Sequence, residues 1–232
     1  MNKFRDHLIQ SKRSYYDFVD VVSRSLKNTH KKVEIGTDNG MPIFLWQSYE
    51  PEYLITAGWQ GDEPAGWEAC RELAARGFKT LSYLPVVCPS AFVYNEHLDW
   101  QGINPDRFFP DPMAESSRAV AAVTELLVSL SPKGHLSLQE DPRRSFAYAY
   151  SWGRSPISKV IQIFDDGPRK GLVIWKNGER EGKHEGMFCE HMHKNGVPYC
   201  IQTETPADGT VPLINRVTAQ VDVVVALTQS QE

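Results

Sequence analysis

A polar turn between two structured segments carries the side chains best suited to chemistry. Gln60 and Glu63 lie three residues apart, after an apolar run at 53–57 that is typical of a buried strand and before a helical run at 64–76. At a strand-to-helix turn, this spacing can direct two oxygen-bearing side chains at one metal ion. The sequence therefore predicts a metal-binding turn at 58–66.

Three more polar segments follow this turn along the chain. Together the four sequences are Gly61-Asp62-Glu63-Pro64-Ala65-Gly66, Asn104-Pro105-Asp106-Arg107-Phe108, Leu136-Ser137-Leu138-Gln139-Glu140-Asp141 and Thr203-Glu204-Thr205-Pro206. In this order they resemble segments of the zinc carboxypeptidase family, nearest its bacterial peptidoglycan-peptide carboxypeptidase and succinylglutamate desuccinylase/aspartoacylase branches. The resemblance extends over residues 33–227. It implies an α/β fold of three layers, α/β/α, with a mixed central sheet.

Both histidine ligands of the family are replaced in this chain. The resemblance implies that Glu63 is a zinc ligand and that Gln60 and Gln139 stand where the family carries histidines. An amide oxygen binds zinc more weakly than an imidazole does, so zinc is expected to be weakly held or absent. Three explanations remain open: a natural pseudoenzyme, a deliberately inactivated variant, or an active enzyme with an unusual metal site.

The resemblance also implies catalytic and substrate-binding roles. Glu204 matches the general base, and Arg107 matches the arginine that binds the terminal carboxylate of the substrate. Asn104 and Asp106 belong to the same substrate-binding segment. Asp106 replaces a common asparagine, which favours either an amine-bearing substrate or a simple pair with Arg107. His97 falls near an arginine that stabilises the oxyanion, and a surface loop histidine is the alternative.

Two other histidine-containing segments are weaker candidates. In Glu190-His191-Met192-His193 the two histidines would share one side of a strand, but the Lys- and Gly-rich surroundings favour a solvated loop. His135 precedes Gln139 by four residues, about 13 Å along a strand, which is too far for a shared metal ion. We therefore expect neither segment to hold a metal.

Alternating strand and helix patterns predict a layered α/β domain. One domain over 1–232 is expected, with a helical extension at 1–30. Helices are predicted at 2–28, 67–76, 114–130 and 211–227, a hairpin at 33–46, and strands at 53–57, 80–87 and 135–138. The segments 160–164, 172–175 and 199–203 fit either a strand or a buried helix, and 88–112 is expected to be a long functional loop.

Composition and charge indicate which partners and which cellular compartment to expect. The chain has 232 residues, 41% of them hydrophobic, and a net charge of −4, which argues against a nucleic-acid partner. No apolar run is long enough to span a bilayer, and the polar N-terminus lacks a secretion signal, so a cytoplasmic protein is expected. Four scattered cysteines, without a Cys-x-x-Cys pair, are expected to be reduced thiols.

The leading functional hypothesis is a metallocarboxypeptidase-type hydrolase that removes the C-terminal residue of a peptide or peptidoglycan fragment. Two alternatives remain. Gln60 and Gln139 favour a non-catalytic protein that binds a carboxylate ligand in the same cleft. The short chain and the turn at 61–66 also allow an N-acyl amino acid amidohydrolase, whose substrate would be a small acylated amino acid.

Overall fold

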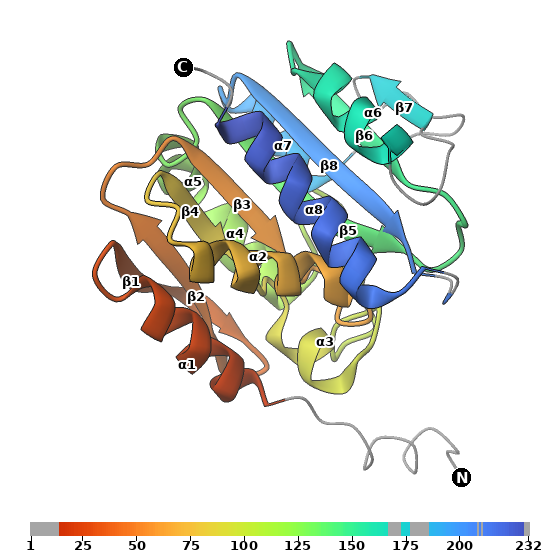
Figure 1. Ribbon diagram of the computed structural model, residues 1–232. Helices are drawn as coiled ribbons and strands as arrows, with labels where there is room; N and C mark the ends of the chain where they lie inside the picture. The colour runs from red at the N-terminus through yellow and green to blue at the C-terminus, as the bar shows by residue number, and fades with distance from the viewer. Residues whose placement is uncertain (1–13, 167–172, 177–185, 208, 210, 230–232) are drawn as a thin grey trace, which may run out of the picture.

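One mixed sheet of eight strands forms the centre of the molecule (Figure 1). The computed structural model describes residues 14–166, 173–176, 186–207, 209 and 211–229. In chain order the strands are β1 (His30–Asp38), β2 (Met41–Ser48), β3 (Tyr53–Ala57), β4 (Leu81–Leu84), β5 (Gly134–Asp141), β6 (Tyr148–Gly153), β7 (Val173–Lys176) and β8 (Tyr199–Pro206). Their order across the sheet is β1-β2-β4-β3-β5-β8-β6-β7.

The four central strands β4, β3, β5 and β8 run parallel, and antiparallel pairs flank them. At the outer edge, β1 and β2 form the hairpin that the sequence predicts. Its turn contains Asn39 and Gly40, both with positive φ, as a tight hairpin turn requires. The sheet is therefore mixed, as expected for the α/β/α fold class.

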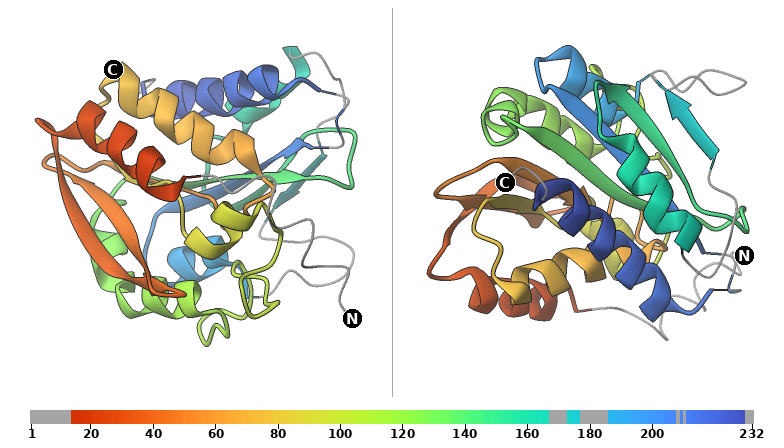
Figure 2. Two further views of the ribbon diagram at one scale, coloured as in Figure 1. Left: turned by 90° about the horizontal axis from the view of Figure 1, so that it is seen from below. Right: turned by 45° about the horizontal axis from the view of Figure 1, so that its top comes forward.

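Helices cover both faces of the sheet (Figure 2). One face packs against α1 (Tyr15–Leu26), α2 (Pro64–Arg76), α6 (Ile157–Asp166) and α8 (Leu213–Thr228), and the other against α4 (Glu115–Ala122), α5 (Thr124–Ser129) and α7 (Phe188–Lys194). The short helix α3 (Pro89–Tyr94) follows β4. Two separate buried apolar clusters result, one on each side of the sheet, and they are the core of a three-layer fold.

Most predicted elements are present, and three differ. Of the segments left open between strand and helix, 160–164 belongs to a helix, α6, and 199–203 to a strand, β8. The helix predicted at 114–130 is divided at Val123 into α4 and α5. The loop predicted at 88–112 contains α3. The segment 190–193 is part of α7 and not of a solvated loop, because Phe188, Cys189 and Met192 form a buried face there. Of the helix predicted at 2–28, residues 1–13 lie outside the described residues.

Two further expectations concern cysteines and membranes. Cys70, Cys88, Cys189 and Cys200 are all buried and form no disulfide with one another, as expected. Across the described part of the chain, no helix is both long and apolar enough to cross a bilayer.

The sheet topology brings chemically useful loops to one edge. From β3 the chain passes through α2 to β4 on one side, whereas β5 pairs with β3 on the other side. In open α/β sheets, ligands bind at the carboxyl ends of strands where the strand order reverses in this way. The segments after β3, β4, β5 and β8 are therefore the place to look for a site.

Candidate metal-binding and active site

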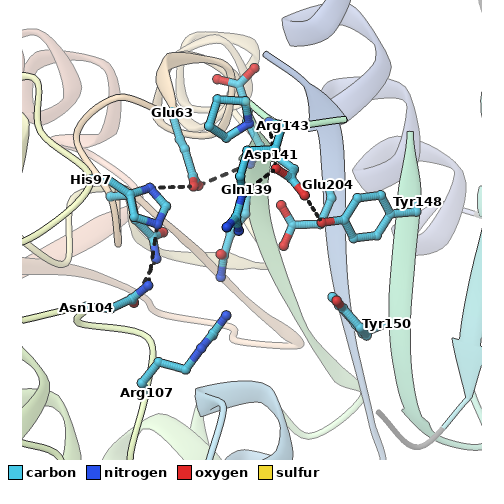
Figure 3. Close-up of a pocket in the computed structure, with 13 residues that line it drawn as sticks. Glu63, His97, Asn104, Arg107, Gln139, Asp141, Arg143, Tyr148, Tyr150 and Glu204 are labelled. Atoms are coloured by element: carbon cyan, nitrogen blue, oxygen red, sulfur yellow. Dashed lines mark hydrogen bonds and ion pairs between the residues drawn. The ribbon is translucent and has the colours of Figure 1, made fainter. Parts of the chain in front are cut away.

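A small polar cavity lies at the carboxyl ends of the central strands (Figure 3). Its volume is about 70 Å³. Seven residues selected from the sequence line it, namely Gln60, Glu63, His97, Asn104, Arg107, Gln139 and Glu204. The tertiary structure therefore gathers four separate segments of the chain, whose positions span more than half of its length, around one space.

Strand register places three of the lining side chains at one level of the sheet. Gln139 of β5 pairs with Glu204 of β8, and Glu204 pairs with Tyr148 of β6. Because side chains alternate along a strand, Tyr148 and Tyr150 project to the same side, and both line the cavity. Both tyrosines also belong to a buried apolar cluster of the core. Because Tyr148 lies opposite Glu204, the two tyrosines also form one wall of the cavity.

The turn after β3 is built on close backbone packing. A Cβ atom on Gly61 would lie 1.8 Å from the backbone oxygen of Ala91 in α3, so only glycine fits there. The Gly61 N–H donates to the Glu96 carbonyl oxygen over 2.7 Å. This bond holds the segment after α3 against the turn and sets His97 beside Asp62.

Helix α2 is capped from a neighbouring strand. Glu63 is the N-cap residue of α2, but no side-chain bond of its own caps the helix. Instead Glu140 of β5 accepts from the Ala65 N–H over 2.6 Å and also pairs with Arg216 of α8. Asp62, one residue before Glu63, does not cap α2. The Glu140–Arg216 pair was missed from sequence, because a buried ion pair leaves no local pattern.

Glu63 is a buried carboxylate directed at two neighbours. Its Oε2 accepts from the Glu140 N–H over 3.1 Å, and its Oε1 lies 3.8 Å from His97 Nδ1. Burial raises the pKa of Glu63 well above its usual range, and the nearby charges of Glu204 and Asp62 raise it further. A positive partner would relieve this cost, because it favours the ionised form.

Hydrogen bonds fix the orientation of the Gln60 amide. The Asp106 N–H donates to Asn104 Oδ1 over 3.0 Å, which identifies that atom as the oxygen. Gln60 Nε2 donates to the same oxygen over 3.0 Å. Gln60 Oε1 is therefore on the opposite side of the amide, where it is buried and has no hydrogen-bond partner among the described residues. An unpartnered buried oxygen calls for an explanation, such as an ion or ligand.

The Gln139 amide is oriented as firmly. Its Nε2 donates to Asp106 Oδ2 over 2.9 Å and to Ser137 Oγ over 3.0 Å. Asp106 is fully buried, and its Oδ1 accepts from the Phe188 N–H over 3.1 Å. These contacts support a positioning role for Asp106. Asp106 was predicted to bind substrate, but both of its carboxylate oxygens contact other residues of the protein and neither reaches the cavity.

Arg107 and Glu204 face the cavity from opposite walls (Figure 3). Arg107 Nη1 donates to the Asp106 carbonyl oxygen over 2.7 Å and lies 3.5 Å from Asp106 Oδ2. This is the Asp106–Arg107 pair that the sequence offered as an alternative. Glu204 Oε1 accepts from Gln202 Nε2 over 2.8 Å. Burial raises the pKa of Glu204 to about 8, so its carboxyl group can hold or release a proton near neutral pH.

Donor atoms that line the cavity or lie next to those that do are suited to a divalent cation, although both family histidines are replaced. Asp62, Glu63 and His97 each offer one ligand atom, and these three atoms lie within 4.8 Å of one another. With the unpartnered oxygen of Gln60 nearby in the cavity wall, carboxylate, imidazole and amide donors are all present. Such mixed donors are typical of sites for first-row divalent metals.

The other two histidine segments do not line the cavity. His191 Nε2 contacts Thr124 Oγ1 at 3.0 Å, whereas His193 Nδ1 contacts the Val197 carbonyl oxygen at 2.9 Å. Within a helix, residues two apart point in different directions, so the two rings do not converge. His135 is buried inside β5, with Nε2 2.9 Å from Thr56 Oγ1.

Comparisons with known proteins agree with this architecture. No protein-family model and no curated protein sequence matches the chain. Its structure is similar to that of a candidate metallopeptidase of Shewanella denitrificans, at 22% identity and a TM-score of 0.77, covering 92% of this chain and 89% of that one. It is also similar to a metallo-carboxypeptidase of Burkholderia cenocepacia, at 13% identity and a TM-score of 0.70, covering 94% of this chain and 70% of that one.

A third similar structure is a metallo-carboxypeptidase of Pseudomonas aeruginosa in complex with (2-guanidinoethylmercapto)succinic acid. It has 16% identity and a TM-score of 0.71, and the match covers 93% of this chain and 68% of that one. These likenesses establish that the chain has the zinc carboxypeptidase-like α/β fold. Because fold does not imply function, the activity is argued from the site.

Proposed function

We propose that this chain is a metal-dependent hydrolase that cleaves the amide bond next to a terminal carboxylate. The reaction would remove the C-terminal residue of a peptide or a peptidoglycan fragment. One observation carries the proposal: Glu63, Arg107 and Glu204 line the same small polar cavity, at the strand ends of a fold shared with metallo-carboxypeptidases.

Arg107 is suited to hold the carboxylate of the substrate. Its side chain is 35% exposed, and Nη1 is anchored by Asp106. The far end of the planar guanidinium can then donate to a ligand carboxylate at the cavity. The Pseudomonas protein is in complex with a succinic acid derivative, which is a carboxylate-bearing ligand. A cavity of about 70 Å³ suits the end of a substrate and not a whole peptide.

Glu204 is suited to act as the general base. A catalytic acid or base works best when its pKa is close to the operating pH, and burial has moved the pKa of Glu204 to about 8. In its ionised form it takes a proton from the attacking water, and it then returns that proton to the leaving amine. Gln202 holds the carboxylate in place through Oε1.

A divalent metal ion, when bound beside Glu63, would polarise the scissile carbonyl and acidify the attacking water. The family resemblance and the structure both support Glu63 as a ligand. Its carboxylate is buried and faces the cavity, and no lysine or arginine among the described side chains pairs with it. Zinc is the ion that the resemblance implies.

A non-catalytic role has one specific observation in its favour. Both family histidines are glutamines, and the Gln139 amide donates to Asp106 and Ser137, so this side chain already serves the protein. If metal binding is too weak for catalysis, the same cavity would bind a carboxylate ligand through Arg107 without cleaving it. The third candidate function is an N-acyl amino acid amidohydrolase, which would use the same site on a substrate with a different acyl group.

A substrate panel with matched variants tests the proposal. Peptides with a free C-terminus, muropeptide fragments and N-acyl amino acids are incubated with the protein and Zn²⁺ or Mn²⁺, and release of the terminal residue is measured. We expect Glu204→Gln to lower the rate at least about 100-fold, the size of effect usual for a lost general base. Glu72→Gln, at an exposed site on α2, is the matched control and should retain the parent rate.

Each outcome of this panel has a distinct meaning. Hydrolysis that survives in Glu204→Gln would contradict the assigned mechanism. Cleavage confined to N-acyl amino acids would favour the amidohydrolase. Carboxylate binding that requires Arg107 without any hydrolysis would instead favour the non-catalytic protein.

A further inference from the structure

We infer that the metal ion is held by Asp62, Glu63 and His97, a donor set displaced from the one that the family resemblance implies. This inference rests on the proposed function, in which a metal acts beside Glu63. It differs from the resemblance in two ligands. The imidazole comes from the segment after α3, and not from the turn or from the end of β5.

The distances within this group suit one ion. His97 Nδ1 lies 3.3 Å from Asp62 Oδ1 and 3.8 Å from Glu63 Oε1, and all three ligand atoms are within 4.8 Å of one another. Two atoms that bind one ion at about 2.0 to 2.4 Å cannot be more than about 4.8 Å apart. The three side chains thus already meet this condition (Figure 3 shows Glu63 and His97).

The backbone presents the group without rearrangement. Asp62 and Glu63 are neighbours in the turn after β3, and the Gly61–Glu96 hydrogen bond holds His97 next to them. Side-chain exposure is 27% for Asp62 and 38% for His97, against 5% for Glu63. The group therefore has one buried ligand and two at the opening, which provides an entry path for an ion.

A second, independent observation points to a ligand in the cavity that Glu63 and His97 line. Gln60 is 2% exposed, lines the cavity with Glu63 and His97, and has an Oε1 atom without a hydrogen-bond partner among the described residues. A buried polar atom left unpaired costs about 1–3 kcal/mol. A metal ion, or a water molecule bound to it, would provide the missing partner.

The displaced set is also the stronger set chemically. The family positions here would offer Glu63 and two amide oxygens, which are weak donors for zinc. Asp62 and His97 add a second carboxylate and an imidazole. The other ring nitrogen, His97 Nε2, lies 3.5 Å from Asn104 Nδ2, so Nδ1 is the nitrogen that faces the two carboxylates. Imidazole with carboxylates suits Zn²⁺ or Mn²⁺, whereas Ca²⁺ prefers oxygen ligands alone.

Calorimetric titration of the full-length protein with Zn²⁺ and Mn²⁺ tests this inference. We expect one site, and we expect Asp62→Asn and His97→Gln each to weaken binding of the better ion at least about tenfold. Gln139→Ala should change it by less than about twofold. His193→Gln, on α7, is the matched histidine control and should bind as the parent does. Circular dichroism of each variant confirms that the fold is retained.

X-ray absorption at the zinc edge gives a second readout that does not depend on activity. The parent protein should show an imidazole ligand to Zn²⁺, and His97→Gln should lose it. Retained binding in His97→Gln together with loss in Gln139→Ala would overturn the inference and leave the proposed function standing. A parent protein that binds neither ion would overturn it as well.

Failure of the proposed function has a different signature. In that case the protein would bind metal through His97 but hydrolyse none of the substrates in the panel, so the metal site would stand without the activity.

Discussion

Asp106 shows how one residue replacement changes the role of a position. The family resemblance placed it among the substrate-binding residues, but its carboxylate is fully buried and accepts from Gln139 and from the Phe188 N–H. Burial raises its pKa, and the adjacent Arg107 opposes that rise. Asp106 therefore connects the substrate-binding segment to β5 and α7, and it orients two cavity residues without reaching the cavity itself.

Truncation of Asp106 is expected to lower stability. Asp106→Ala would leave Gln139 Nε2 with one acceptor fewer and the buried Phe188 N–H with none, which should lower the free energy of unfolding by about 2 kcal/mol or more. Urea denaturation measures this change. Asp111→Ala, at an exposed position nearby in the chain, is the control and should cost less than about 0.5 kcal/mol. Equal losses in the two variants would contradict the positioning role.

At the scale of elements, the site depends on how β3, α2 and α3 meet. The turn 58–66 joins β3 to α2, and α3 packs so closely on it that Gly61 has no space for a side chain. Gly66 is similarly close to β5, since a Cβ there would lie 2.2 Å from the Leu138 oxygen. The glycines of the motif are thus required by packing between elements, and they set the positions of Glu63 and His97.

Gly61→Ala should separate these elements. A methyl group would overlap the Ala91 oxygen, so α3 must move, at a cost of about 2 kcal/mol or more, and the His97 ring should withdraw from Asp62. Thermal unfolding and zinc titration measure the two effects. Gly102→Ala is the matched control: its φ of 80° imposes a backbone cost of about 1 kcal/mol, but no atom lies within 4 Å of the added carbon. Zinc affinity in Gly61→Ala equal to that of the control would contradict the packing argument.

At the scale of the whole molecule, a neutral histidine lies within the core. His135 is fully buried between β3 and α7, where Nε2 contacts Thr56 and the ring packs against Phe188. Burial lowers its pKa to about 3, because a charged imidazole would be desolvated there. The folded protein therefore keeps His135 neutral at a pH where the unfolded chain would protonate it.

This difference predicts that acid removes the contribution of His135 to stability. Below pH 6.5 the unfolded chain binds a proton at His135 and the folded chain does not, so the contribution of this residue to the free energy of unfolding falls as the pH falls. Between pH 7 and pH 5 the loss from this residue should be about 2 kcal/mol. Urea denaturation at pH 7 and at pH 5 measures the free energy of unfolding. Between these two pH values His135→Gln should lose about 2 kcal/mol less of it than the parent does, whatever the stability of the variant at pH 7. The His193→Gln control should lose as much as the parent, and an equal loss in all three proteins would contradict the prediction.

Local patterns were sufficient for much of the fold, whereas the predicted members of the site came from the family resemblance. Alternating apolar residues, the Asn39-Gly40 turn and the Gly77 helix end are decided within a few residues, so the strands and helices near them were predicted correctly. The carboxyl ends of parallel strands meet at one edge, and Gln60, Gln139 and Glu204 follow or end such strands. The resemblance, together with this topology, therefore predicted seven of the side chains that line the cavity.

Only the tertiary structure decided what those side chains face. The direction of the Gln60 and Gln139 amides depends on Asn104 and Asp106, which lie more than thirty residues away in the chain. The approach of His97 to Asp62 depends on a hydrogen bond between the turn and the segment after α3. Contacts of this kind join segments that are distant in sequence, so they leave no periodic or local signal, and the geometry of the proposed metal site follows from them alone.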